Sequence, residues 1–164
     1  RTQEYFGRTI LVENPSTYIA FTENEMSEAE FMNRAAKATG CGILLDLNNI
    51  FVQAFNHGYD AFEYIDIIDI EPVGEMHLAG HTEKDLGNNK TVLIDTHNRN
   101  VRTEVWDLYE YAVRKFTQKG KPPVPTLIEW DQDFPGLDEL VAEANKAKAI
   151  IEKVQASEQE NAAQ

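Results

Sequence analysis

The sequence has 164 residues, of which 42% are hydrophobic and 26% are charged, and its formal net charge at pH 7 is −13. This composition is typical of a soluble globular protein, and the excess of carboxylates argues against a nucleic-acid partner, which normally requires a basic surface. No apolar run approaches the roughly 18 residues that span a bilayer, so we expect no membrane segment. The single cysteine, Cys41, excludes an intrachain disulfide and a thiolate-rich metal site, and these features together suit a cytoplasmic protein.

The first predicted unit is a strand followed by a helix. An apolar run at 9–13 predicts the strand, and a polar turn follows it. The helix is predicted at 27–39, where Ser27 and Glu30 have the spacing of a capping box at the first turn. The sequence therefore begins as a βα unit.

The same alternation continues along the chain. The further predicted elements, in order, are a strand at 42–46, a helix at 60–68, a strand at 73–77, a polar loop, a helix at 102–117, a strand at 125–129 and a helix from about 136 into the 140s. Four strand-and-helix units in succession predict an α/β fold with a parallel sheet. Because a TIM (β/α)8 barrel usually needs about 250 residues, these four parallel βα units predict half of a barrel, over residues 1–154. The segment 155–164 has no apolar side chain larger than alanine, and we expect it to be disordered.

Each predicted strand ends in a residue that can bind a metal ion. These residues are Glu13, Asp46, His77 and Glu129. The carboxyl ends of parallel strands lie on one side of a sheet, so residues far apart in the sequence should converge there.

Further donors lie close to these strand ends. His81 follows His77 by four residues, and Asn49 follows Asp46 by three. Asp95 and His97 would share a face if their segment were extended, and Asp131 would face the same way as Glu129 if that strand continued.

Carboxylates and imidazoles without sulfur suit iron, manganese or zinc. These donors exceed the needs of one ion, so we expect two or more metal ions, with a carboxylate such as Glu13 as a bridge. A single carboxylate at the end of a buried strand is more often held in an ion pair, and His57, at a predicted turn, is interpreted as structural. Convergence of so many groups on one rim favours the metal site.

Five motifs resemble a known family, the multinuclear non-haem iron-dependent oxidative enzymes, whose best-known members modify cysteines of small peptides, as in methanobactin biosynthesis. The resemblance extends from residue 8 to about residue 145. The motifs occur in the order Glu13-Asn-Pro-Ser-Thr-Tyr18, Leu44-Leu-Asp-Leu-Asn-Asn49, His77-Leu-Ala-Gly-His81, Asp95-Thr-His97 and Ile128-Glu-Trp-Asp131.

The resemblance implies a role for each candidate residue. Four would be core metal ligands, namely Glu13, Asp46, His77 and Glu129. Four would complete the second and third metal positions, namely Asn49, His81, Asp95 and His97. Asp131 would be a ligand-shell group or a catalytic acid or base. The fold would be the C-terminal half of a barrel like those of xylose-isomerase-like sugar isomerases and metal-dependent endonucleases, and the N-terminal half would supply further histidines.

The implied function is oxidation, with oxygen and two or three iron ions, of cysteine residues in a ribosomally made peptide. A separate peptide-recognition protein is the implied partner. One alternative is a divalent-metal sugar isomerase or epimerase, for which manganese would be typical, and another is a phosphodiesterase, which the net charge disfavours. A third alternative is an inactive metal-binding fragment. Because a half-barrel leaves two strand edges exposed, we also expect either self-association or a missing N-terminal half that is present in the parent protein.

Overall fold

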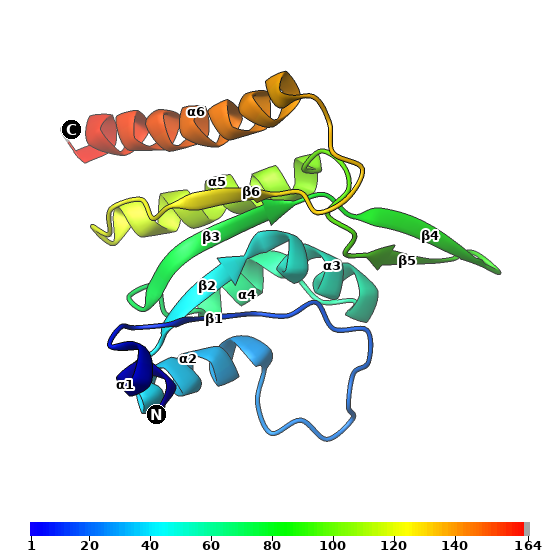
Figure 1. The fold of residues 1–164 in the computed structure, drawn as a ribbon, viewed down its shortest axis with the longest axis horizontal. Coiled ribbons are helices and arrows are strands. Elements are labelled where there is room, and N and C mark those ends of the chain that lie inside the picture. Colours follow the sequence, from blue (N-terminus) through cyan, green and yellow to red (C-terminus); the bar gives the residue numbers. More distant parts are fainter. Residues whose placement is uncertain (163–164) are drawn as a thin grey trace.

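The structure is a computed structural model that describes residues 1–162 (Figure 1). Its elements lie along the chain as β-strands and α-helices that alternate over most of its length. In chain order they are α1 Thr2–Phe6, β1 Leu11–Glu13, α2 Glu28–Thr39, β2 Gly42–Asp46, α3 Leu47–His57, α4 Ala61–Ile67, β3 Val73–Ala79, β4 Thr82–Gly87, β5 Lys90–Ile94, α5 Thr103–Gln118, β6 Thr126–Glu129 and α6 Leu137–Ala162.

The main sheet has four strands in the order β1-β2-β3-β6, and all three pairs are parallel. The register places Asp46 opposite His77 and Ala79 opposite Glu129. The α/β fold with four parallel strands is therefore confirmed, and it corresponds to part of a TIM barrel. Within residues 1–162 the sheet is open, with β1 and β6 at its edges.

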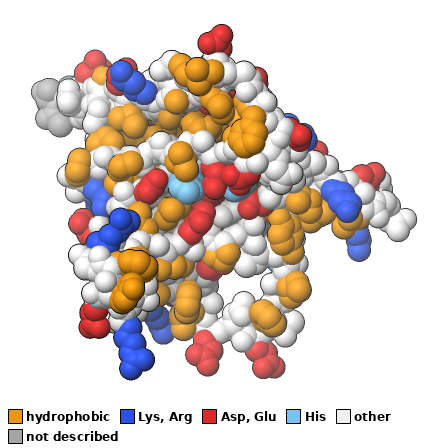
Figure 2. All heavy atoms as spheres, in the orientation of Figure 1, with side chains coloured by type: hydrophobic (Ala, Val, Ile, Leu, Met, Phe, Trp, Pro, Cys, Tyr) orange, Lys and Arg blue, Asp and Glu red, His pale blue; other side chains and the backbone are white. Residues whose placement is uncertain are grey.

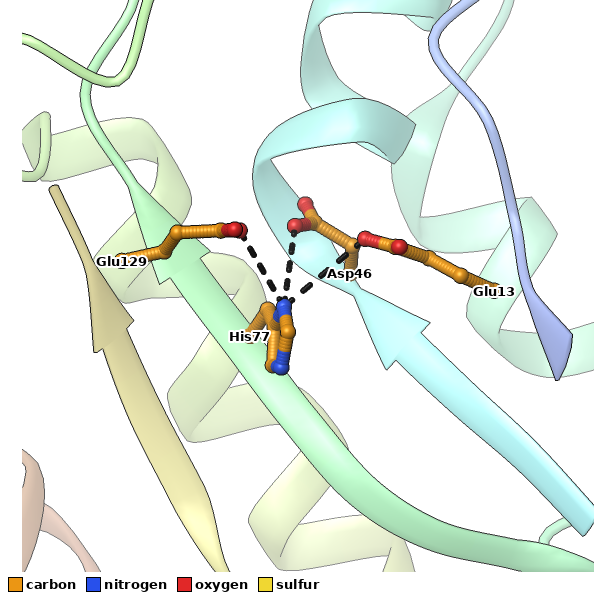
Figure 3. Close-up of side chains that lie close together, drawn as sticks. All are labelled: Glu13, Asp46, His77 and Glu129. Atoms are coloured by element: carbon orange, nitrogen blue, oxygen red, sulfur yellow. Dashed lines mark hydrogen bonds and ion pairs between the residues drawn. The ribbon is translucent and has the colours of Figure 1, made fainter. Parts of the chain in front are cut away.

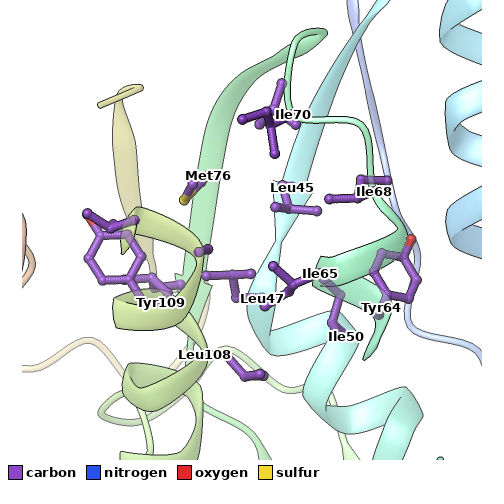
Figure 4. Packing of buried hydrophobic residues seen from close by; sticks show 14 of the residues in the cluster. Leu45, Leu47, Ile50, Tyr64, Ile65, Ile68, Ile70, Met76, Leu108 and Tyr109 are labelled. Atoms are coloured by element: carbon purple, nitrogen blue, oxygen red, sulfur yellow. The ribbon is translucent and has the colours of Figure 1, made fainter. Parts of the chain in front are cut away.

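One face of this sheet packs against helices to form the core (Figure 4). Side chains alternate between the two faces of a strand, and Ile43 and Leu45 of β2 join Met76 and Leu78 of β3 on the buried face. Tyr109 of α5 is fully buried against them. Each large side chain buried in this way contributes about 1.5–3 kcal/mol to stability. The opposite face of the sheet is left for the polar strand ends.

The capping box predicted for α2 is present. Ser27 Oγ accepts a hydrogen bond from the backbone N–H of Glu30, and Glu30 Oε2 accepts one from the backbone N–H of Ser27 at 2.8 Å. Gly40 ends the helix with φ +68°, a left-handed conformation that glycine adopts without strain.

Helix α3 was absent from the elements predicted by sequence. It begins directly after β2, and Asp46 is its N-cap because Asp46 Oδ1 accepts a 2.7 Å hydrogen bond from the backbone N–H of Asn49. Its buried residues Leu47, Ile50 and Ala54 have helical spacing. The segment after Asp46 is thus a helix that extends from the strand end, rather than a loop.

The segment predicted as a polar loop after His81 forms the antiparallel β4–β5 hairpin, which projects from the body of the molecule (Figure 1). Asn88 and Asn89 both have positive φ, at 54° and 57°. Two central residues with positive φ are characteristic of hairpin turns whose twist matches that of the strands. An extended segment through Asp95 and His97 would have placed their side chains on one face. In the structure β5 ends at Ile94, so both residues lie beyond the strand.

The end of the chain also differs from the expectation of a disordered segment 155–164. Helix α6 continues to Ala162, and residues 163–164 lie outside the described residues. Val154 is buried, and Arg114 of α5 forms a 2.9 Å ion pair with Glu158. Polar contacts with α5 therefore hold a segment that has little apolar surface of its own.

None of the helices within residues 1–162 combines the length and the apolarity needed to cross a bilayer.

Candidate metal centre

The four strand-end residues converge on one rim, as the sequence predicts. Three carboxylates surround the Nδ1 atom of His77 (Figure 3). Glu129 Oε2 lies 3.1 Å from this nitrogen, Glu13 Oε1 lies 3.7 Å away and Asp46 Oδ2 lies 3.9 Å away. One potential ligand atom from each of the four residues lies within 4.8 Å of the others. This grouping is called the His77 group below.

An imidazole nitrogen carries one proton at most, so it can donate to one of these three carboxylates only. The other ring nitrogen, His77 Nε2, faces Glu75 Oε1 at 3.6 Å. If the ring proton is on Nε2, it points toward the Glu75 carboxylate. The lone pair of Nδ1 then faces the three carboxylates, and the nitrogen and the carboxylate oxygens can bind the same cation. Carboxylates that orient metal-binding histidines in this way are common around metal sites.

A second group comprises His97, Glu129 and Asp131, and it is called the His97 group below. His97 Nδ1 lies 3.2 Å from Asp131 Oδ2 and 3.4 Å from Glu129 Oε2. The backbone supports this arrangement, because the N–H of Asp131 donates to the carbonyl of His97 at 2.7 Å. Glu129 belongs to both groups, whereas Glu13 belongs to the His77 group only.

Asp95 lies beside His97 and outside both groups. His97 Nε2 is 2.6 Å from Asp95 Oδ1, which also accepts a hydrogen bond from Asn48 Nδ2. The other oxygen, Oδ2, accepts from Ser16 Oγ at 3.0 Å. Both oxygens of Asp95 are thus engaged, and the carboxylate orients the His97 ring.

Asn49 and His81 are also outside the two groups. Asn49 Nδ2 donates to the carbonyl of Asn14 at 3.0 Å, whereas Asn49 Oδ1 is buried without a hydrogen-bond partner. His81 Nδ1 lies 2.8 Å from Asn48 Oδ1, and its ring lies against that of Phe51. Burial lowers the pKa of His81 to about 4, so this imidazole is neutral at pH 7.

Asn14, Asn48, Ser16 and Glu75 are site residues that the sequence analysis did not single out. Asn14 is buried and clamps the end of β2, since its side chain accepts from the N–H of Asp46 at 2.8 Å and donates to the Asp46 carbonyl at 2.9 Å. Three of the four stand inside or beside the strand-end motifs. The sequence shows that these three residues lie close to strand ends, but the residues that they contact depend on the order of the strands in the sheet.

The electrostatics of the centre are those of uncompensated carboxylates. Burial raises the pKa of Asp46 well above its usual range, and burial likewise raises the pKa of Glu13. The hydrogen bond to Asp95 raises the pKa of His97 to about 9. Among the described residues, the carboxylates of the two groups form ion pairs with histidines and with no lysine or arginine. Such a site favours a bound cation.

The centre is open to solvent on one side. Figure 2 shows acidic side chains gathered around a histidine on the face in view, with hydrophobic side chains around them. The side chain of Asp131 is 60% exposed and that of Glu13 is 41% exposed, whereas that of Asp46 is fully buried. Glu13 and Asp131 therefore form the solvent-exposed side of the centre.

His57 lies apart from the centre, in agreement with its structural interpretation. It is the last residue of α3, and its Nε2 donates to the carbonyl of Thr17 at 2.8 Å. Both residues border a separate cavity of about 680 Å³ between the β1–α2 loop and α4, which contains none of the expected metal ligands.

The comparisons with known proteins agree with the resemblance drawn from the five motifs. The chain matches the family described as "RiPP precursor modification enzyme MbnB/TglH/ChrH" over residues 1–152, where a RiPP is a ribosomally made and post-translationally modified peptide. It is 50% identical over 147 residues to a UPF0276 protein of Psychromonas ingrahamii, which covers 90% of the chain and 50% of the relative. It is 45% identical over 152 residues to a UPF0276 protein of Vibrio parahaemolyticus, which covers 93% of the chain and 51% of the relative.

The chain thus spans about half the length of these curated relatives. The family match covers almost all of the described residues and includes every residue of the two groups. This chain therefore belongs to the MbnB/TglH/ChrH family of RiPP precursor modification enzymes.

Proposed function

We propose that the protein uses iron held at this rim to oxidise cysteine residues of a ribosomally made peptide. The family supports a peptide precursor as the substrate. The observation that carries the metal dependence is the convergence of three carboxylates on one imidazole nitrogen, at 3.1 to 3.9 Å, without a lysine or arginine to neutralise them.

The residues present fit a metal ion. Asp46 Oδ2 is buried with no hydrogen-bond partner, and an unpaired buried oxygen of this kind is costly unless a ligand satisfies it. The donors are oxygens and imidazole nitrogens, which suit iron and also accommodate manganese or zinc. The His77 group would hold one ion, the His97 group would hold a second, and Glu129 would touch both.

A third position is part of the proposal. Asn49 Oδ1 is a second buried oxygen without a partner, and it lies one helical turn beyond Asp46. Together with His81 it would provide an amide oxygen and a neutral imidazole, which is the form of histidine that binds metals.

Iron bound at these positions would supply one-electron and oxygen chemistry that side chains alone lack. We assign Asp131, which is exposed and lies 3.2 Å from His97 Nδ1, the role of accepting the proton of an incoming cysteine thiol. The buried Asp46, clamped by Asn14, would keep the inner wall of the site rigid. We include a separate peptide-recognition protein and a reducing, cytoplasmic setting in the proposal, since free thiols persist there.

The test gives the full-length protein, isolated with its metals and with any required partner, the cysteine-containing peptide encoded beside its gene. We expect an oxygen-dependent change in peptide mass, a large loss of that activity in Asp131→Asn, and wild-type activity in the control Asp133→Asn. An unchanged peptide, or conversion that persists without oxygen, contradicts the oxidative assignment. Turnover of a sugar without oxygen would favour an isomerase.

A further inference from the structure

Asn48 connects two candidate ligands that lie outside both groups. It is the second residue of α3, and its side chain is completely buried. Asn48 Nδ2 donates to Asp95 Oδ1 at 2.6 Å, and Asn48 Oδ1 lies 2.8 Å from His81 Nδ1. One amide therefore contacts a histidine from the end of β3 and an aspartate from the end of β5.

The chemistry of this chain of contacts determines the direction of each hydrogen bond. Asp95 Oδ1 accepts the hydrogen bond from Asn48 Nδ2, and Asp95 Oδ2 accepts one from Ser16 Oγ at 3.0 Å. Asn48 must then turn its NH₂ group toward Asp95, which leaves its carbonyl oxygen facing His81. A carbonyl oxygen only accepts, so this 2.8 Å contact requires a proton on His81 Nδ1, and the neutral form of the ring then has its lone pair on Nε2.

We propose that Asn48 is a positioning residue that holds His81 as the Nδ1–H tautomer and Asp95 in its orientation beside His97, and so leaves His81 Nε2 as the lone-pair nitrogen for a metal ion. Phe51 supports this arrangement, since its ring lies 5.3 Å from that of His81, centre to centre, at an interplanar angle of 31°. The inference rests on the proposed function for the metal ion, but the tautomer of His81 is a property of the metal-free chain.

Asn48 also connects the metal positions to each other. Asp95 Oδ1 lies within hydrogen-bond distance of both Asn48 Nδ2 and His97 Nε2. His97 Nδ1 in turn faces Glu129 and Asp131. Removal of the amide would leave His81 Nδ1–H without its partner and would free one side of Asp95. Loss of such outer contacts typically weakens metal binding by about 10- to 100-fold.

The first experiment measures the His81 tautomer without metal, from the ¹⁵N chemical shifts of its ring at pH 7. We expect the Nδ1–H form in the wild-type chain, a shift toward the Nε2–H form in Asn48→Leu, and the Nδ1–H form again in Asn48→Asp, which keeps an accepting oxygen. An Nε2–H ring in the wild-type chain, or the same Nδ1–H ring in Asn48→Leu, would overturn the inference. The wild-type and Asn48→Asp spectra keep the test decisive if Asn48→Leu does not fold.

The second experiment measures the affinity of Fe²⁺ under anaerobic conditions by competition with a chelator. We expect about 10- to 100-fold weaker binding in Asn48→Leu. The matched control is Asn56→Leu, also in α3, whose amide holds only the backbone of Leu93. Equal affinity in Asn48→Leu and wild type contradicts the positioning role. A wild-type chain with the Nδ1–H tautomer that retains no Fe²⁺ contradicts the proposed function and supports the assignment of the tautomer.

Discussion

Glu129 is the residue that joins the two groups of the candidate metal centre. It lies at the end of β6, with Oε2 at 3.1 Å from His77 Nδ1 and at 3.4 Å from His97 Nδ1. Glu13, by contrast, contacts the His77 group only. Because the proposed function gives Glu129 a part in both metal positions, removal of Glu129 and removal of Glu13 should differ in the amount of metal lost.

We expect Glu129→Ala to lose metal from both groups and Glu13→Ala to lose it from one, so that bound metal falls to about one third and to about two thirds of the content of three occupied positions. Metal content per chain, measured by mass spectrometry after anaerobic loading and desalting, checks this. Asp133→Asn, next to the centre but in neither group, is the control. Equal losses in the two glutamate variants would show that Glu129 does not join the positions.

At the scale of elements, an ion-pair network joins α5 to α6. Glu110 of α5 lies 2.9 Å from Lys153 of α6, and Arg114 pairs both with Glu110 at 3.2 Å and with Glu158 at 2.9 Å. The hydrogen bond from Lys153, together with Arg114, lowers the pKa of Glu110. The ion pairs of Glu110 therefore stabilise the fold at pH values above the usual pKa of a glutamate. This stabilisation is lost as the pH falls through the lowered pKa of Glu110.

We expect Glu110→Gln to reduce the free energy of unfolding at pH 7 by about 0.5–1 kcal/mol, as is typical of partly exposed ion pairs. The difference from wild type should shrink as the pH falls below about 4.5. Urea unfolding between pH 7 and pH 3 measures it. A difference that stays constant over this range would contradict the assignment to the charge of Glu110.

A lysine of α5, Lys115, caps the C-terminal end of helix α4. The ammonium group of Lys115 donates to the carbonyls of Ile65, Asp66 and Ile68, which the end of a helix leaves without intrahelical donors. Burial lowers the pKa of Lys115, so the ammonium is held there by these hydrogen bonds against a cost in solvation.

Replacing Lys115 by methionine keeps most of the apolar stem and removes the donor. We expect a loss of about 1.5–3 kcal/mol in the free energy of unfolding, the range for hydrogen bonds to charged groups. Chemical denaturation of Lys115→Met beside Lys119→Met, an exposed lysine at the end of the same helix, provides the measurement. A loss of similar size in both variants would mean that the cap is not the cause.

At the scale of the whole molecule, the sheet is open on two edges and on one face. Strands β1 and β6 are its outer strands, and Val12 and Leu127 on them are 38% and 45% exposed. Exposed strand edges and apolar side chains favour pairing with another chain.

We expect the 164-residue chain to self-associate, with a mass that rises with concentration in light scattering after size-exclusion chromatography. Leu127→Lys should shift this association to higher concentration, because a charge would be buried in the contact. Leu86→Lys, on the projecting hairpin and 58% exposed, is the matched control. A monomer at all concentrations would refute the expectation.

The sequence by itself determined the strands of the sheet and the residues at their ends. Apolar runs mark buried strands, and parallel strands place their carboxyl ends on one rim, so the convergence of Glu13, Asp46, His77 and Glu129 could be predicted without coordinates. The capping box of α2 was equally visible, because it is a contact between residues three apart. In each case the interaction depends on neighbours in the chain or on a general rule of sheet geometry.

Only the tertiary structure decided how the donors are divided. Asp46 Oδ2 faces His77 Nδ1, Glu129 joins two groups, and Asn48 links His81 to Asp95. These roles depend on strand register and on backbone conformation, such as the φ of +47° at His97. Contacts between residues 30 to 50 positions apart are set by packing of the whole sheet, and a local pattern of residue types carries no record of them.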